Sequence, residues 1–128
     1  MDDATVEAVG KLSEALEFVE RARGHLYSFH QLTGHADGLL GEACDALATA
    51  GHEAEAQRLR TELVGLNVLH GRWTFQVVEE FDDGYWTQFR EHERRVRDAL
   101  CGGERHVFEA HMKERLRTKG RPGHEAHP

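Results

Sequence analysis

The fold is decided by residues 12–50, which read LSEALEFVERARGHLYSFHQLTGHADGLLGEACDALATA. Apolar residues recur along this stretch in alternating steps of three and four, and Thr33 is the only polar member of the series. The series is Leu12, Ala15, Val19, Ala22, Leu26, Phe29, Thr33, Ala36, Leu40, Ala43, Leu47 and Ala50. This spacing is typical of a helix that packs along a partner helix, as in a coiled-coil seam. We therefore predict one long helix over this stretch.

A second periodic series follows Gly51 and predicts another long helix. Because a glycine just past a periodic segment is a helix C-cap signal, the chain is expected to reverse at Ala50-Gly51-His52. The series is Ala56, Leu59, Leu63, Leu66, His70, Trp73, Val77 and Glu80, and after a slip of phase it continues as Phe81, Tyr85, Phe89, His92, Val96 and Ala99. The slip indicates a stutter, or a break at Asp82-Asp83-Gly84.

These patterns predict an all-α fold: a long antiparallel helical hairpin that pairs into a bundle, followed by a short C-terminal helix. The second arm is expected to end at Cys101-Gly102-Gly103, and the short helix to cover about residues 104–117. Residues 1–117 then form a single helical domain, and residues 118–128, which hold both prolines, form a disordered tail.

The alternative is a compact four- or five-helix bundle in which the first arm breaks at residues 33–37. Gly34, Gly38 and Gly41 favour that break, because a glycine inside a helix costs about 1 kcal/mol. Against the break, the seam keeps its phase across Gly34.

Composition and charge exclude several classes of function. The net charge is −7, and non-specific binding of nucleic acid requires a clustered positive surface instead. The chain lacks a run of about 18 apolar residues, so we expect no membrane partner. Its N-terminus has no signal-peptide pattern, which predicts a cytoplasmic protein. Cys44 and Cys101 match no metal or redox spacing, and we expect two buried, reduced cysteines.

The second arm carries apolar residues on two opposite sides, which predicts a homodimer. One side faces the first arm, and a two-helix hairpin has nothing to cover the other side. A second copy of the chain would cover it. The predicted dimer interface comprises Val64, Val68, Gly71, Phe75 and Val78.

Several polar residues lie on or beside the predicted seam and form a candidate ligand-binding site. The candidates are His30, Thr33, His70, Trp73 and Glu80. In one interpretation they form a polar layer that fixes the register: Thr33 faces a buried His70, and Glu80 pairs with Arg23 or Arg21. In the other interpretation, imidazole and carboxylate groups of His30, His70 and Glu80 bind a metal in the bundle core.

The sequence contains no metalloprotease motif, phosphate-binding loop or Ser/His/Asp arrangement, so we expect neither enzymatic activity nor a cofactor. Two hypotheses of function follow. The first is a homodimeric helical interaction or structural module, and the alternative is a metal- or small-ligand-binding helical bundle centred on His30, His70 and Glu80.

Three stretches of the chain resemble a family of small, uncharacterised helical proteins from actinobacteria. The stretches are residues 29–37 (FHQLTGHAD), 71–84 (GRWTFQVVEEFDDG) and 120–125 (GRPGHE). The resemblance implies a compact, cytosolic, helical bacterial protein. It implies no activity, cofactor or partner.

Overall fold

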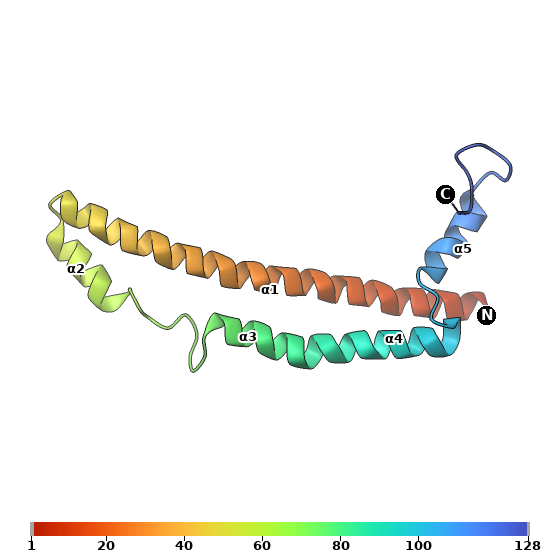
Figure 1. Cartoon of the computed structure of the whole chain (residues 1–128), viewed down its shortest axis with the longest axis horizontal. Coiled ribbons are helices and arrows are strands. Elements are labelled where there is room, and N and C mark those ends of the chain that lie inside the picture. The colour runs from red at the N-terminus through yellow and green to blue at the C-terminus, as the bar shows by residue number, and fades with distance from the viewer. Residues whose placement is uncertain (1, 128) are drawn as a thin grey trace. The chain divides into compact units, whose positions relative to one another are not determined.

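The computed structural model describes residues 2–127 and confirms an all-α fold (Figure 1). Its elements are α1 (Asp3–Thr49), α2 (Glu53–Glu62), α3 (Thr74–Phe81), a π-helical turn η1 (Asp82–Trp86), α4 (Thr87–Cys101) and α5 (Val107–Leu116). The contacts group into two compact units. Unit 1 contains the chain up to Glu20 and from Tyr85 onward, and unit 2 contains Arg21–Gly84.

The predicted first arm is confirmed as one uninterrupted helix of 47 residues, and the alternative with a break at residues 33–37 is wrong. The helix begins at a capping contact, in which the Thr5 backbone N–H donates to Asp2 Oδ1 at 2.7 Å. It ends as predicted at Gly51, whose φ of 91° is a left-handed value, and the His52 N–H donates to the Leu47 carbonyl at 2.8 Å. The cost of the internal glycines is therefore smaller than the gain from packing along the helix.

The face of α1 that packs against its own chain differs from the predicted seam. One line of the seam is confirmed, because Leu12, Val19, Leu26, Thr33, Leu40 and Leu47 are all half-buried. The other predicted line is wrong, because Ala15, Ala22, Phe29, Ala36 and Ala43 are exposed. Its place is taken by residues four positions after members of the first line, namely Leu16, Arg23, His30 and Cys44, although Asp37 at the same spacing is exposed. Steps of three and four lead to opposite sides of a helical residue, so periodicity alone permits both choices.

The second arm is not one helix, because residues 63–73 between α2 and α3 are irregular. Gly65 and Gly71 adopt φ values of 80° and 74°, which do not belong to a right-handed helix. The β-branched Val64 and Val68 weaken the helix further. Leu69 and Arg72 form an isolated antiparallel bridge around the turn. These local preferences outweigh the apolar period that predicted a helix here.

The predicted slip of phase near Asp82 takes the form of η1. A π-helical turn holds one more residue than an α-helical turn, so the apolar face moves by one position. The chain stays helical from Thr74 to Cys101 across this turn.

In unit 1, α4 runs antiparallel to the start of α1 (Figure 1). The Ser13 hydroxyl donates to Glu93 at 3.1 Å, and Trp86 Nε1 donates to Glu20 at 2.7 Å. α4 ends as predicted, with Gly102 in a left-handed conformation. The core of this unit contains Val6, Val9, Cys101 and Val107, with Val96 and Phe108 packed against it. Residues 118–127 follow α5 in turns, and the Thr118 N–H donates to His124 Nδ1 at 3.1 Å.

In unit 2, α3 and α2 both lie against α1 (Figure 1). Val78 of α3, Cys44 of α1 and Ala56 of α2 are buried. Arg60 of α2 forms an ion pair with Asp45 of α1 at 2.9 Å. Both cysteines of the chain are unlinked and buried, so their prediction as small buried hydrophobic residues is confirmed.

Candidate interaction surface

The predicted polar layer is found in part, at His30. Its Nδ1 atom lies 2.6 Å from the hydroxyl of Thr74, the first residue of α3. The His30 ring also meets Phe75 edge-on, with centroids 6.5 Å apart, and Trp73 packs against the other side of Phe75 at 5.2 Å. His30 was predicted to lie near Trp73 and His70; it meets Trp73 through Phe75, whereas His70 is exposed in the irregular segment.

The other polar predictions on the seam are wrong. His70 is exposed in the irregular segment, so the prediction that it is buried is wrong. The Thr33 hydroxyl does not face it but donates to the Phe29 carbonyl of its own helix at 2.7 Å. Glu80 is exposed and pairs with Arg72. The interruption of the second arm moves the residues before Thr74 off the helical register that placed them on the seam.

The three residues proposed to bind a metal are not gathered in one place. Among residues 2–127, the structure brings together no group of three or more histidine, cysteine, aspartate or glutamate side chains that could hold a metal ion. His30 contacts Thr74 and Phe75, Glu80 pairs with Arg72, and His70 is exposed in the irregular segment.

A polar cluster that the sequence did not reveal links α1 to the end of α3. Arg23 donates to both carboxylate oxygens of Asp82, at 2.7 and 3.1 Å, and the Tyr27 hydroxyl donates to Asp82 at 2.9 Å. The Arg23 guanidinium lowers the pKa of Asp82, and the Asp82 carboxylate raises the pKa of Tyr27. The spacing of Arg23 and Tyr27 by four residues places them on one face and was the available signal. This cluster pairs its own charges and fixes the register of α1 and α3.

Unit 1 contains an open groove of about 530 Å³ between α1, α4 and the segment before α5. Charged residues of both signs line it: Glu17, Glu20, Glu91, Glu93, Glu104 and Glu109 with Arg90, Arg94, Arg97 and Arg105. At its wall, Glu93 is buried, accepts from Ser13, and lies 3.1 Å from Arg97. Because charges of both signs line the groove, it has no strong field of one sign.

The predicted dimer stripe does not exist as one surface. It was drawn on a continuous helix, whereas Val64, Val68 and Gly71 lie in the irregular segment and Phe75 and Val78 lie on α3. Val78 is buried and Phe75 half-buried within the chain itself, so neither is available as predicted. Val64 and Val68 are exposed, at 44% and 47%.

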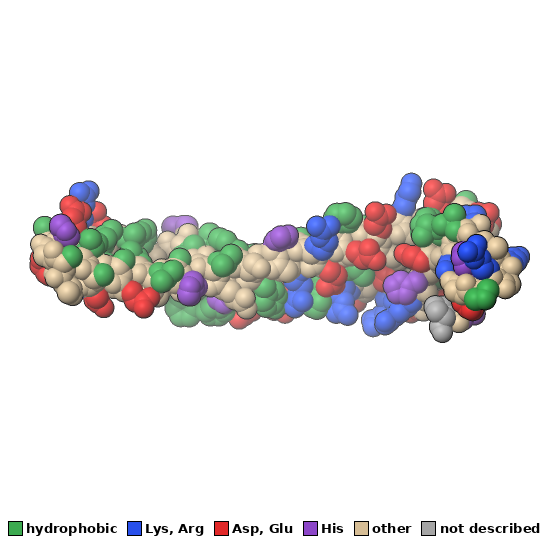
Figure 2. All heavy atoms as spheres, turned by 90° about the horizontal axis from the view of Figure 1, so that it is seen from above, with side chains coloured by type: hydrophobic (Ala, Val, Ile, Leu, Met, Phe, Trp, Pro, Cys, Tyr) green, Lys and Arg blue, Asp and Glu red, His purple; other side chains and the backbone are tan. Residues whose placement is uncertain are grey.

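An uncovered apolar surface is present instead on α1, and in unit 2 it follows a regular helical repeat. We call this surface the α1 stripe and define it as Ala22, His25, Phe29, Leu32, Ala36 and Leu39, of which His25 is the polar member. The steps alternate three and four, and all six residues are exposed. Phe29, Leu32 and Leu39 keep 41%, 66% and 52% of their surface accessible. Figure 2 shows hydrophobic side chains on the surface of unit 2, in the left half of the view.

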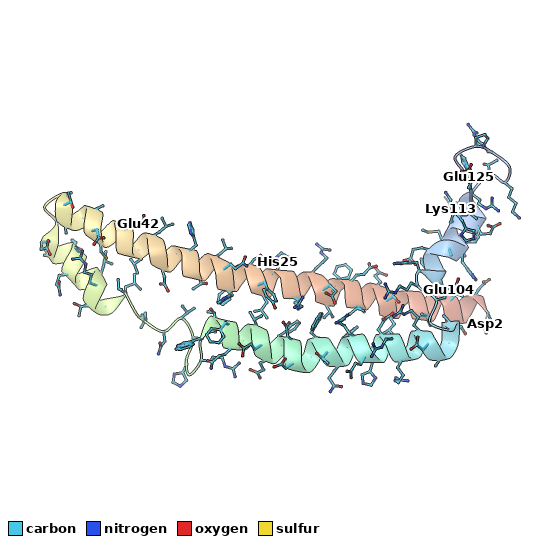
Figure 3. The ribbon with its side chains drawn as sticks, in the orientation of Figure 1. Asp2, His25, Glu42, Glu104, Lys113 and Glu125 are labelled. Carbon is cyan, nitrogen blue, oxygen red and sulfur yellow. The ribbon has the colours of Figure 1, made fainter. Side chains whose placement is uncertain are left out.

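A polar line borders the α1 stripe on the side away from α3. It consists of Arg21, Ser28, His35 and Glu42, each seven residues from the next and all exposed. Figure 3 labels His25 of the stripe and Glu42 of this polar line, both on the unit 2 part of α1. A narrow apolar line with a charged border is the pattern that helices use to pair with other helices.

Over residues 2–127, no helix has the length and hydropathy needed to cross a membrane. No protein-family model, curated protein or solved structure matches the chain.

Proposed function

We propose that this protein is a cytoplasmic helical interaction module that forms a homodimer through the α1 stripe. The observation that carries the proposal is the exposure of Phe29, Leu32 and Leu39 along one regular line of α1. Contiguous exposed apolar surface of this kind marks interaction sites in soluble proteins. We also propose that the protein is related to the actinobacterial helical proteins that it resembles. That relationship implies a compact helical protein in the cytosol.

The architecture of unit 2 explains why the stripe needs a second molecule. α1 packs on α2 and α3 with the lines that contain Leu26 and His30, and the α1 stripe lies beyond them around the helix. The helices of unit 2 form a single layer on one side of α1, so none of them covers the other side (Figure 1). Burial of a leucine or phenylalanine side chain contributes about 1.5–3 kcal/mol, and a symmetric dimer buries each of these side chains twice.

The proposal is tested by the substitution Leu32→Glu, with Gln31→Glu as its matched control. Both substitutions place a glutamate at an exposed position of the same helical turn, and Gln31 lies off the stripe. Leu32→Glu is expected to weaken dimerisation about a hundredfold or more, because the lost burial at two sites is worth about 3 kcal/mol at least. Gln31→Glu should leave it unchanged.

Sedimentation equilibrium at micromolar concentration, with circular dichroism to verify helicity, measures the effect. A wild-type protein that stays monomeric at about 100 µM, a hundredfold above a dissociation constant of about 1 µM, would refute the proposal. The proposal would also be refuted if the Leu32→Glu dimer were as stable as the Gln31→Glu dimer, because the interface would then lie elsewhere.

A further inference from the structure

We infer that two copies of the chain pair through the α1 stripe in an antiparallel arrangement in which Ala22, His25 and Phe29 of one copy face Leu39, Ala36 and Leu32 of the other. This inference rests on the proposed function and adds the orientation and register of the dimer. Three observations carry it: the self-complementary order of side chains in the stripe, the charges on its polar border, and the apolar character of its opposite border.

The order of the stripe residues is self-complementary when the two helices run in opposite directions. With Phe29 facing Leu32 of the second copy, the two-fold axis passes between these residues, and every member of the stripe receives a partner from the stripe. The largest side chains then meet at the centre, and the small Ala22 meets the large Leu39 at each end. This alternation of large and small side chains is what close packing requires.

The charges on the polar border favour the same register. In an antiparallel pair of helices, each border faces the same border of the partner across the seam. With Phe29 opposite Leu32, Arg21 of each copy faces Glu42 of the other, which forms two ion pairs related by symmetry. A shift by one heptad in either direction places Arg21 opposite His35 or opposite Thr49, and both ion pairs are lost.

A parallel arrangement forms neither of these contacts. There the polar border of one helix faces the opposite border of the other, which consists of Leu26, Thr33 and Leu40. These three residues are half-buried against their own chain and carry no charge. In the parallel arrangement neither Arg21 nor Glu42 faces an opposite charge across the seam, so the antiparallel arrangement is favoured.

Cross-linking of single-cysteine substitutions tests the orientation. Ala22→Cys and Leu39→Cys both lie on exposed positions, whereas the native Cys44 and Cys101 are buried and serve as an unreactive background. A short bifunctional maleimide should link the two variants when they are mixed, and should not link either variant to itself. In the antiparallel dimer, the two copies of position 22 lie about 25 Å apart along the axis, at 1.5 Å per residue.

Charge substitutions test the register separately. Glu42→Arg should weaken the dimer about tenfold, because two exposed attractive pairs become repulsive, and Arg21→Glu/Glu42→Arg should restore it to within about threefold. Gln31→Arg, off the stripe, should change the affinity less than threefold. The double variant must also retain the helicity of the wild type by circular dichroism.

The outcomes separate this inference from the proposed function. A monomeric wild-type protein overturns both. A dimer that Leu32→Glu dissociates, but in which Ala22→Cys links to itself, overturns the antiparallel arrangement and leaves the proposed function standing. A dimer in which the mixed variants link but the charge exchange restores nothing overturns the ion pairs and hence the register.

Discussion

The packing of α5 on α1 predicts opposite effects for one substitution at two glycines of the same helix. Gly10→Ala is expected to destabilise the protein or leave it unchanged, whereas Gly24→Ala is expected to stabilise it. A Cβ atom at Gly10 would lie 2.7 Å from Cβ and 2.8 Å from Cγ of Phe108, and a Cβ at Gly24 would meet nothing within 4 Å. Carbon atoms in ordinary contact are about 3.5–4.0 Å apart.

The magnitude follows from two terms. Replacement of a helical glycine by alanine contributes about 1 kcal/mol of stability at either position. At Gly10 the new methyl group also overpacks the contact with α5, which costs about 1–3 kcal/mol. A change of rotamer at Phe108 does not relieve the clash, because its Cβ is fixed to the α5 backbone, so α5 itself must shift. Gly10→Ala should therefore be less stable than Gly24→Ala by about 1–3 kcal/mol.

Urea unfolding followed by circular dichroism measures this difference. The unfolding midpoints of the two variants should differ by roughly 1 M, with equal slopes. All samples need the same protein concentration, since self-association raises apparent stability. If Gly10→Ala proves as stable as Gly24→Ala, then the contact between Phe108 and Gly10 does not hold α5 on α1, and the reasoning is refuted.

Three further predictions concern single groups. Arg23 lowers the pKa of Asp82 below the ordinary 3.8, so this carboxyl contributes stability that is fully present above pH 3.8 and is lost as pH falls through its lowered pKa. Asp82→Asn should therefore reduce the loss of folding stability as pH falls, while Asp83→Asn should not. An acid dependence of stability that Asp82→Asn leaves unchanged would contradict the role of Asp82. Both cysteines are buried, so Ellman's reagent should modify them only as fast as the protein unfolds, and rapid labelling of the native protein would show that at least one of them is accessible. His106 has a φ of 58°, a left-handed value that costs a non-glycine residue about 1 kcal/mol. His106→Gly should therefore raise the melting temperature measured by calorimetry. A melting temperature below that of the wild type would argue against strain at this residue.

The features of the fold that depend on near neighbours in the chain were predictable. The long first helix, its end at Gly51 and the end of α4 at Gly102 follow from helical periodicity and glycine caps, and the structure confirms all three. The slip of phase near Asp82 was also predictable from the sequence, because a π-helical turn shifts the apolar period. The irregular segment was missed because its apolar residues keep a helical period while Gly65 and Gly71 adopt left-handed conformations.

The residues that form the candidate surface depend on whether the line of Phe29 or the line of His30 packs against the rest of the chain. Periodicity does not predict which of the two lines packs. Residues three and four positions after a seam residue lie on opposite sides of it, and after Leu26 the sequence favoured the apolar Phe29 over the polar His30. In the structure, His30 and Arg23 turn inward because Thr74 and Asp82 supply hydrogen-bond partners from a distant part of the chain. Because His30 packs against the chain in place of Phe29, Phe29 remains exposed as a member of the α1 stripe. Helical periodicity was sufficient to predict that α1 is a helix with a broad apolar surface. Which part of that surface remains exposed depends on residues far away in the chain, because a polar side chain is buried where partners satisfy it.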